Sequence, residues 1–434
     1  MRDRDLLEHL YHTAIAAANP GPAVAAALEQ EPADPATPLW IVAVGKASAP
    51  MAAAAVATAR RQHRRIAGGI VVPPAPTSAP DPTIPVVVGD HPEPGHRSLA
   101  AATALGEVTQ RVGPKDEVWM LLSGGATSLI GAPAGEATQD DLQRLYALLL
   151  ASGLDITAMN TVRKRFTRWG GGKLAQALAA KRTRQLIVSD VIGDDLAAIG
   201  SGPCVPDTST AAEVRTLLET AALLTRLPTP FRAALDAVEK RVMPETQTAG
   251  APVFDRVYTT IVVSNRLALE AVARRAAELG LAPEIIPQPL SGEAAEAGAS
   301  VAAMLTSYPA TSNAQHGPRR CLIAGGETTV TLGAAPGLGG RSQELALAAA
   351  RGLAGRSGLA LLSAGTDGRD GPTDAAGAIV DGTTWESVRV AGRDPAADLA
   401  RHDAYPALEA ADALFKPGLT GTNVMDVVVG LGEE

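Results

Sequence analysis

The sequence predicts an α/β protein of two domains, and three observations lead to this prediction. The chain has 434 residues, which is more than one ordinary hydrophobic core takes up. Hydrophobic residues make up 46% of it, enough for each domain to bury a core. Short apolar runs recur along the chain, each ending in Gly, Ser or Asp before a helical pattern begins. Short apolar strands that alternate with helices are typical of a mostly parallel sheet covered by helices on both faces.

The apolar runs define the expected strands. They are Trp40–Val44, Val86–Val88, Val118–Leu122, Leu186–Val188, Thr259–Val263, Cys321–Ala324 and Leu359–Leu362. The polar residues that follow them stand at the carboxyl ends of strands, where open α/β sheets bind their ligands. A helix is expected after Thr138, because Asp141 stands three residues later and Gly153 follows the apolar-periodic run as a stop signal.

The division into domains is expected where the pattern of strands and helices breaks. Pro, Thr, Gln and Gly interrupt it over Val242–Pro252, and Ser307–Pro318 is expected to be an exposed loop. We therefore predict an N-terminal domain of residues 1–245 and a C-terminal domain of residues 253–434.

Net charge, cysteine content and the lack of long apolar stretches exclude several classes of protein. The net charge of −8 argues against a nucleic acid or an anionic membrane as the main partner. Cys204 and Cys321 lie far apart and outside any CxxC spacing, so a disulfide framework or a zinc site is not expected. The N-terminus lacks the apolar stretch of a signal peptide, and no window approaches the ~18 apolar residues of a membrane span. We expect a soluble cytoplasmic protein.

Lys46 follows an expected strand and opens an Ala-rich helix. A lysine there opposes the helix dipole at a cost of about 0.3–1 kcal/mol, which makes sense if an anion binds beside it. A solvated surface lysine is the alternative. The segment is not a Walker A loop, since Trp40 stands where its first glycine belongs and Ala47 where Ser or Thr should follow the lysine.

Two glycine-rich turns follow other expected strands. Ser123, Gly124 and Gly125 form the first, and Gly325-Gly326-Glu327 forms the second. Glycines let backbone N–H groups approach an oxyanion, although a tight turn of this kind needs no ligand. Asn265 stands at another strand end and joins the candidate binding residues.

Aspartates and an arginine complete the candidate set. Asp190, Asp194 and Asp195 follow a buried strand, and Asp367 follows a later one. Mg²⁺ bound to a nucleotide takes one or two carboxylates, and a hydroxyl acceptor needs a carboxylate for its proton. Helix capping is the alternative, and we expect one of Asp194 and Asp195 to be a cap.

Arg341 precedes an apolar helix, where its planar guanidinium suits bidentate contact with phosphate. The alternative is a surface ion pair with Glu344. The basic cluster Asn160–Arg165 is expected mostly as a solvated helix face, from which one cation could receive a substrate carboxylate. His91 and His96 are expected to shape a rigid loop.

Nine motifs of the sequence, taken together, form a characteristic combination. They are AVGKASAPM, GDHPEPGHRS, LLSGGATSL, MNTVRKRFTRWGGGKLA, IVSDVIGDDLAAIGSGPCVPD, GGETTVTLG, GGRSQELALAAA, SAGTDGRDGPTDAAGAIVDG and TGTNVMDVVV. In this order they resemble the glycerate 2-kinase family, whose C-terminal half is called the MOFRL domain. The resemblance runs from about residue 6 to about residue 430.

The resemblance implies a larger Rossmann-like αβα N-terminal domain and a smaller α/β MOFRL domain, with the active site in the cleft between them. It implies ATP and Mg²⁺ as cofactors, D-glycerate as substrate and 2-phosphoglycerate as product. The family's proposed catalytic lysine falls on Lys46 and its arginine on Arg341. Two positions depart from the pattern, since Ser342 stands where Asn is expected and Cys204 where Thr is expected. Neither departure removes a charge.

In the mechanism we expect, Lys46 and Arg341 clamp the transferring phosphoryl group. Asp190, with Asp194 or Asp367, holds Mg²⁺, and one of these aspartates accepts the proton of the 2-hydroxyl. Backbone N–H groups of Ser123–Ala126 and Gly325–Glu327 cradle phosphates or the carboxylate. The partners are then the small molecules D-glycerate and ATP, without nucleic acid or membrane, and a homodimer is left open.

Two other functions are compatible with an α/β ligand site. An NAD(P)-dependent hydroxypyruvate reductase is the runner-up, although no GxGxxG opens a helix after a strand with an acidic residue ~20 positions on. A non-enzymatic sensor of sugar acids is the third, but it would not explain a lysine, an arginine and several aspartates at strand ends.

Overall fold

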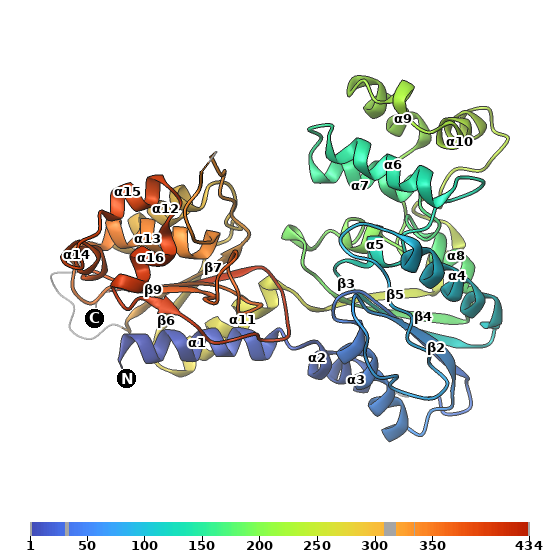
Figure 1. Ribbon diagram of the computed structural model, residues 1–434. Helices are drawn as coiled ribbons and strands as arrows, with labels where there is room; N and C mark the ends of the chain where they lie inside the picture. Colours follow the sequence, from blue (N-terminus) through green and yellow to red (C-terminus); the bar gives the residue numbers. More distant parts are fainter. Residues whose placement is uncertain (1, 31–33, 308–317, 334, 433–434) are drawn as a thin grey trace. The chain divides into compact units, whose positions relative to one another are not determined.

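A computed structural model describes residues 2–30, 34–307, 318–333 and 335–432 (Figure 1). Most of the expected loop Ser307–Pro318 lies outside these residues. The chain forms two compact units. We call Pro20–Val262 the N-terminal unit, and Met1–Asn19 together with Val263–Glu434 the C-terminal unit.

The N-terminal unit is built on a five-stranded sheet with the order β2-β1-β3-β4-β5. Its strands are β1 (Leu39–Val44), β2 (Ile66–Val72), β3 (Glu117–Ser123), β4 (Arg182–Val188) and β5 (Val257–Val263). β1 runs parallel to β2 and β3, and β3 runs parallel to β4. This is the doubly wound order 2-1-3-4-5, whose topological switch point lies between β1 and β3.

The helices of this unit either cover the two faces of the sheet or form a separate group. They are α2 (Pro20–Glu29), α3 (Ser48–Arg61), α4 (His96–Arg111), α5 (Ala126–Leu129), α6 (Gln139–Leu150), α7 (Ile156–Phe166), α8 (Lys173–Leu178), α9 (Ala211–Thr220) and α10 (Thr229–Glu239), with short 3₁₀ turns at Ile192–Asp194, Ile199–Ser201, Leu224–Arg226 and Pro252–Arg256. Trp40, Val42 and Val44 share a core with α4 and α8. Alternate residues of a strand face opposite sides, and α3 packs on β1, β2 and β3 from the other side (Figure 1).

Four helices of this unit have an apolar core of their own. α6, α7, α9 and α10 contribute its buried residues, and the rings of Phe166 and Phe231 lie 4.7 Å apart at its centre. The predicted start of α6 is confirmed, since Thr138 and Asp141 form a reciprocal capping box. The helices α9 and α10 stand away from the sheet in Figure 1.

One edge of the N-terminal sheet differs from the expectation. Val86–Val88 forms only an isolated bridge through Val71 and Val86, so the strand expected there is wrong. The edge strand is instead β2, whose apolar run is interrupted by Gly68 and Gly69. A Cβ on Gly69 would lie 1.9 Å from the carbonyl oxygen of Ile41, so the close approach of β1 requires glycine here. This glycine breaks the apolar run, which is why the strand was not predicted.

The C-terminal unit has a six-stranded sheet with the order β10-β9-β8-β11-β7-β6. Its strands are β6 (Ala282–Ile285), β7 (Arg320–Gly326), β8 (Ala360–Gly365), β9 (Gly377–Asp381), β10 (Leu414–Phe415) and β11 (Asp426–Leu431). Only the β6–β7 pair in this sheet is parallel, and the other neighbours pair antiparallel. The expectation of a mostly parallel sheet is therefore wrong here, because β8 turns into β9 without an intervening helix and β11 inserts antiparallel between β7 and β8.

Helices lie on the two faces of this second sheet. They are α1 (Asp3–Ala17), α11 (Asn265–Glu278), α12 (Ala294–Thr306), α13 (Arg341–Leu353), α14 (Thr384–Val390), α15 (Pro395–Ala400) and α16 (Ala404–Ala410). α12, α13 and α16 share one core with the strands, while α1 packs against α11, β8 and β11 (Figure 1).

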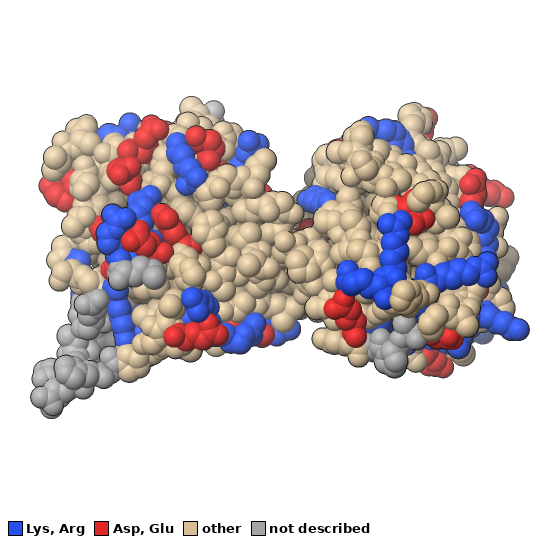
Figure 2. All heavy atoms as spheres, turned by 90° about the horizontal axis from the view of Figure 1, so that it is seen from below, with Lys and Arg blue, Asp and Glu red and all other residues tan. Residues whose placement is uncertain are grey.

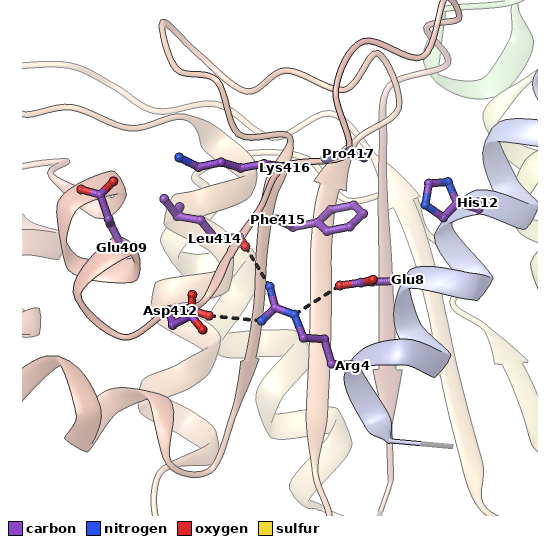
Figure 3. Close-up of a pocket in the computed structure, with 9 residues that line it drawn as sticks. All are labelled: Arg4, Glu8, His12, Glu409, Asp412, Leu414, Phe415, Lys416 and Pro417. Atoms are coloured by element: carbon purple, nitrogen blue, oxygen red, sulfur yellow. Dashed lines mark hydrogen bonds and ion pairs between the residues drawn. The ribbon is translucent and has the colours of Figure 1, made fainter.

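The helix α1 belongs to the C-terminal unit, unlike the expected domain of residues 1–245. Its apolar stripe is buried there, and the hydroxyl of Tyr11 donates a 2.8 Å hydrogen bond to the carbonyl of Gly365. Arg4 donates to the carbonyls of Asp412 and Leu414, in a pocket of about 550 Å³ (Figure 3). These bonds satisfy the carbonyl groups of two residues at or beside β10, and they add to the buried apolar stripe that attaches α1 to this unit.

The division between the units also falls later than the Val242–Pro252 break, because β5 still belongs to the N-terminal sheet.

On the face drawn in Figure 2, Lys and Arg side chains lie beside Asp and Glu side chains on each unit. No helix in the described part of the chain has the length and apolar character that a membrane span requires.

Candidate active site

The carboxyl ends of β1, β3 and β4 bring together the candidate residues of the N-terminal unit. The register pairs Val44 with Leu122 and Ser123 with Val188, so these strands end at one edge. Lys46, Ser123, Gly124, Gly125 and Asp190 follow at that edge, and we call them the switch-point site. Its loops are tied by the backbone N–H of Lys46, which donates to the carbonyl of Gly124 at 2.9 Å. The N–H of Ala47 donates to Oγ of Ser123 at 2.9 Å.

Glycines are required in this site because neighbouring atoms occupy the space of a side chain. A Cβ on Gly45 would lie 2.1 Å from Oγ of Ser123. A Cβ on Gly124 would lie 1.7 Å from Oδ2 of Asp190, so the Asp190 carboxylate rests against the backbone of the glycine turn. Gly125 has a φ of +82°, which favours glycine by itself.

Lys46 is exposed, and its ammonium group forms no hydrogen bond or ion pair with any residue that the structure describes. Behind it, Oγ of Ser48 is buried at the start of α3 and has no hydrogen-bond partner among the described residues. An exposed cation, a bare glycine backbone and a carboxylate therefore converge at the switch point. This combination fits the phosphate groups and the carboxylate-bound metal of a nucleotide.

His91 also lies at this site, which the sequence analysis missed. A Cβ on Gly125 would lie 3.2 Å from Cε1 of His91 and 3.4 Å from Cγ of Lys46. Burial and the charge of Lys46 lower the pKa of His91, while Asp190 acts in the opposite direction. The only signal in the sequence was the position of His91 after an apolar run. His96 lies at the first residue of α4 and, like His91, is exposed.

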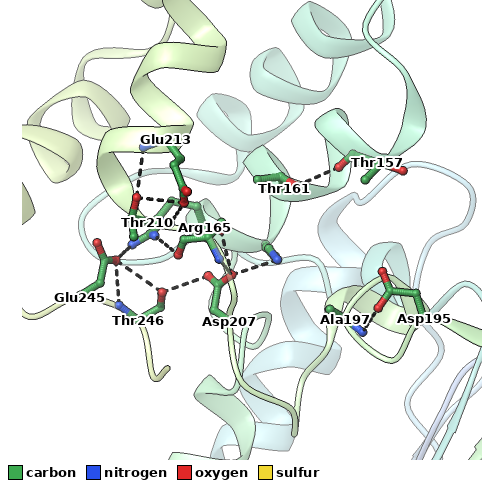
Figure 4. Close-up of polar contacts among 12 residues, drawn as sticks. Thr157, Thr161, Arg165, Asp195, Ala197, Asp207, Thr210, Glu213, Glu245 and Thr246 are labelled. Carbon is green, nitrogen blue, oxygen red and sulfur yellow. Dashed lines mark hydrogen bonds and ion pairs between the residues drawn. The ribbon is translucent and has the colours of Figure 1, made fainter. Parts of the chain in front are cut away.

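The predicted metal ligands are divided between the units. Asp190 and Asp194 belong to the N-terminal unit and Asp367 to the C-terminal unit. Asp194 lies in a 3₁₀ turn with a φ of +57°. Asp195 accepts the N–H of Ala197 at 2.9 Å, so it is the turn-forming member of this pair (Figure 4). The described residues contain no group of three or more His, Cys, Asp or Glu side chains placed to hold a metal ion.

The basic cluster on α7 is used inside the N-terminal unit. Lys164 forms a buried 2.9 Å ion pair with Asp207, and Arg165 pairs with Glu245 and donates to the carbonyl of Ser209 (Figure 4). The Nζ of Lys173 donates to three carbonyls at the end of α7, those of Lys164, Arg165 and Thr167. The expectation of a solvated face is wrong for Lys164 and Arg165, which are buried.

Arg341 lies at the first residue of α13 and is held by two carboxylates. Its Nε and Nη2 donate to Asp426 at 2.7 and 3.0 Å, and its Nη1 donates to Glu327 at 2.6 Å. The ion pair considered with Glu344 is not formed, because Glu344 is buried against Nδ1 of His402 at 2.9 Å. Asp426, at the start of β11, was missed because the sequence analysis quoted it only as part of a motif.

Burial shifts the pKa values of this cluster. Burial alone lowers the pKa of Arg341, but the hydrogen bonds and charges of Asp426 and Glu327 outweigh it and raise the pKa. Burial raises the pKa of Asp426, with Glu327 and Asp367 adding to the rise and Arg341 opposing it. Burial also raises the pKa of Asp370 to about 7, although its carboxylate accepts the N–H groups of Ser342 and Gln343 and so caps α13.

The other candidates of the C-terminal unit have identifiable roles in the fold. Nδ2 of Asn265 donates to the carbonyls of Val424 and Asp426 at 2.8 and 2.9 Å. Gly326 has a φ of +144°, and a Cβ there would lie 2.2 Å from the carbonyl oxygen of Leu290. Oδ1 of Asp367 accepts the N–H of Arg369 at 2.9 Å.

The two departures from the family pattern lie in buried positions. Oγ of Ser342 has no hydrogen-bond partner among the described residues. Cys204 packs in the core beneath the sheet, where burial raises the pKa of its thiol to about 12.

Comparison with known proteins covers the whole chain. Residues 6–236 match a family described as a domain of unknown function, DUF4147, and residues 320–426 match the MOFRL family. A D-glycerate 2-kinase from Thermotoga maritima is 35% identical over 90% of this chain and 90% of its own. A glycerate 2-kinase from Pyrococcus horikoshii is 34% identical over 91% of this chain and 87% of its own.

Other relatives carry a different name. A protein from Agrobacterium vitis, assigned provisionally to the hydroxypyruvate reductases, is 37% identical over 98% of this chain and 93% of its own.

Solved structures agree with the fold. The crystal structure of a Thermotoga maritima glycerate kinase superimposes with a TM-score of 0.88 at 34% identity, covering 98% of both chains. A Pyrococcus horikoshii protein gives the same TM-score of 0.88 at 33% identity, covering 100% of this chain and 99% of the other. The chain belongs to the glycerate 2-kinase family with a C-terminal MOFRL domain.

Proposed function

We propose that this protein transfers the γ-phosphoryl group of ATP to the 2-hydroxyl of D-glycerate and forms 2-phosphoglycerate. The observation that carries the proposal is the switch-point site, where an exposed lysine without an ion-pair partner among the described residues stands beside a glycine turn and a carboxylate. Phosphoryl transfer asks a protein mainly for positioning and charge stabilisation, which these groups supply. The kinase names of the Thermotoga and Pyrococcus relatives support the same reaction.

The residues then take the following roles. Lys46 neutralises charge on the transferring phosphoryl group, and the backbone N–H groups of Gly124 and Gly125 bind an oxyanion. Asp190 accepts the proton of the attacking hydroxyl or holds Mg²⁺ together with Asp194 or Asp367. When bound, Mg²⁺ supplies positive charge to the phosphate oxygens. Arg341 retains N–H groups beyond those that bind Asp426 and Glu327, so it too can meet a phosphate oxygen.

Lys46 and Arg341 belong to different units, and the proposal requires both units for one reaction. Either residue alone would then be insufficient. If Lys46→Ala or Arg341→Ala keeps kcat within about threefold of the wild-type value, the shared role is wrong, because a group that stabilises transition-state charge contributes about 10²-fold or more.

The alternative function is an NAD(P)-dependent hydroxypyruvate reductase, which the Agrobacterium vitis relative favours by its name. The N-terminal sheet has a doubly wound order, but no GxGxxG fingerprint follows β1. The position of Lys46 at the end of β1 supports the kinase instead.

One assay distinguishes the candidates. The purified protein is incubated with MgATP and D-glycerate, and the product is read through enolase alone, without phosphoglycerate mutase. Formation of phosphoenolpyruvate supports a 2-kinase, because enolase does not accept 3-phosphoglycerate. ADP release without an enolase signal would indicate a 3-kinase or another acceptor. Oxidation of NADH with hydroxypyruvate, without ADP release under the first conditions, would replace the kinase with the reductase.

A further inference from the structure

His91 stands where a residue that contacts the substrate would stand. A Cβ on Gly125 would touch both the His91 ring, at 3.2 Å, and the Lys46 side chain, at 3.4 Å. The two side chains therefore flank the same glycine, whose backbone belongs to the proposed oxyanion cradle. Ser128, the third residue of α5, has its Oγ 2.8 Å from Nδ1 of His91.

Two contacts of Ser128 indicate which nitrogen of His91 carries the proton. The Ser128 hydroxyl donates its one hydrogen to the carbonyl of Gly125 at 3.1 Å. In that arrangement its Oγ accepts from His91, and Nδ1 carries a hydrogen. In a neutral imidazole the other nitrogen, Nε2, has a lone pair and can only accept. No residue in the described part of the chain bonds to Nε2.

The charged groups around the ring favour this neutral form. Lys46, from the loop after β1, lowers the pKa of His91, and Asp190, from the loop after β4, opposes it. The neighbouring Asp90 is occupied by Arg97, whose Nε and backbone N–H donate to it at 2.6 and 2.8 Å. His91 therefore presents an acceptor beside Lys46, which can only donate.

We propose that Nε2 of His91 accepts a hydrogen bond from a hydroxyl group of the hydroxy-acid substrate, and so holds the acid in place beside Lys46. This role rests on the proposed function, since the substrate must carry such a hydroxyl. It differs from that of Asp190, which remains the candidate for taking the proton in the transfer step.

Three variants separate binding through Nε2 from support of the turn. His91→Asn keeps a donor near the position of Nδ1 but has no atom at Nε2, whereas His91→Gln places its amide oxygen near Nε2. Ser128→Ala removes the partner of Nδ1 and leaves Nε2 intact. We expect His91→Asn to raise KM for D-glycerate about tenfold or more with KM for ATP unchanged, as loss of one substrate hydrogen bond would. His91→Gln should recover part of this loss, and Ser128→Ala should have the smallest effect.

The opposite pattern would overturn the proposal. If His91→Asn behaves as wild type while His91→Gln and Ser128→Ala are both impaired, His91 only supports the glycine turn. Unfolding temperatures of the three variants show whether any loss comes from misfolding.

A measurement without turnover separates this proposal from the proposed function. D-glycerate is titrated into protein with ¹⁵N-labelled histidines, and the Nε2 resonance of His91 is assigned by comparison with His91→Asn. A shift of that resonance in a protein that does not phosphorylate D-glycerate would overturn the kinase and retain His91 as a binding residue. An unchanged resonance would overturn the role of His91, whether or not the protein is a kinase.

Discussion

Lys46 and Arg341 are both cations near the start of a helix, but their surroundings differ. Lys46 is exposed and has no ion-pair partner among the described residues, and the loop beside it is shaped by glycines. Arg341 is held on two sides by Asp426 and Glu327, and the Asp426 side chain is only 8% exposed. The comparison indicates that Lys46 is available for a ligand at little cost to the fold. Arg341, in contrast, also stabilises the C-terminal unit.

The largest effect should follow from breaking the Arg341 cluster. Arg341→Ala leaves Asp426 buried without its bidentate partner. Because Arg341 is itself 32% exposed, we expect a loss near the lower end of the range for broken buried pairs, about 3 kcal/mol in the free energy of unfolding. Denaturant unfolding measures it, and Arg389→Ala, which breaks an exposed pair with Glu386, is the control. Equal stability of the two variants would show that Asp426 does not need Arg341.

Lys46→Ala should separate activity from stability. We expect kcat to fall about 10²-fold, roughly 2.7 kcal/mol of transition-state stabilisation, with the unfolding temperature unchanged. Steady-state kinetics and calorimetry on the same preparation test both parts. Lys115→Ala is the control, because Lys115 is exposed before β3, at the opposite end of that strand. An unfolding temperature several degrees below wild type would contradict the view that Lys46 stands free of the fold.

Gly124→Ala should displace Asp190 without removing a charge. The added methyl group would lie 1.7 Å from Oδ2 of Asp190, so the carboxylate or the turn must move. We expect kcat/KM to fall about tenfold or more, since small displacements of positioned groups reduce rates strongly. Gly333→Ala is the matched control, because no atom of the described residues lies within 4 Å of its added Cβ. Full activity of Gly124→Ala would mean that the position of Asp190 does not matter for the reaction.

The last prediction concerns a pH dependence in the C-terminal unit. Burial raises the pKa of Asp370 from its ordinary value of 3.8 to about 7. Between these values the folded protein holds a proton that the unfolded chain has released, so Asp370 makes stability fall as pH rises. One such proton contributes a slope of at most about 1.4 kcal/mol per pH unit.

Asp370→Asn should flatten this slope between pH 4 and 7, as unfolding temperatures measured across about that range would show. Asp374→Asn is the control, because the Asp374 side chain is 67% exposed and its pKa is lowered rather than raised. A slope that is unchanged in Asp370→Asn would show that Asp370 does not cause this pH dependence.

The strands that carry the candidate site could be predicted, because β1, β3, β4, β7 and β8 each contain a continuous apolar run that is followed by polar residues or glycine. The prediction failed where packing, rather than the pattern of apolar residues, determines the structure. Gly68 and Gly69 interrupt β2, and the antiparallel β11 follows a loop rather than a helix.

The same limit applies to the site residues. The glycine turns and Lys46 could be read from their position after strands, and the structure brings the members of the switch-point site to one edge. His91 and Asp426 could not, since His91 reaches the site from a loop without a strand and Asp426 opens a strand instead of following one. The cluster at Arg341 likewise depends on pairing between distant segments.

The position of α1 affects how this chain matures during synthesis. Tyr11 bonds to Gly365, and Thr422 bonds to the carbonyl of Ala18, so part of the surface that binds the first helix is made only late in synthesis. The N-terminal unit is one uninterrupted segment that follows α1 in the sequence, so it can fold before α1 is bound. Contacts over such sequence separations form slowly. A nascent chain stalled before residue 420 should therefore expose the apolar stripe of α1 to chaperones, although its N-terminal unit is already complete.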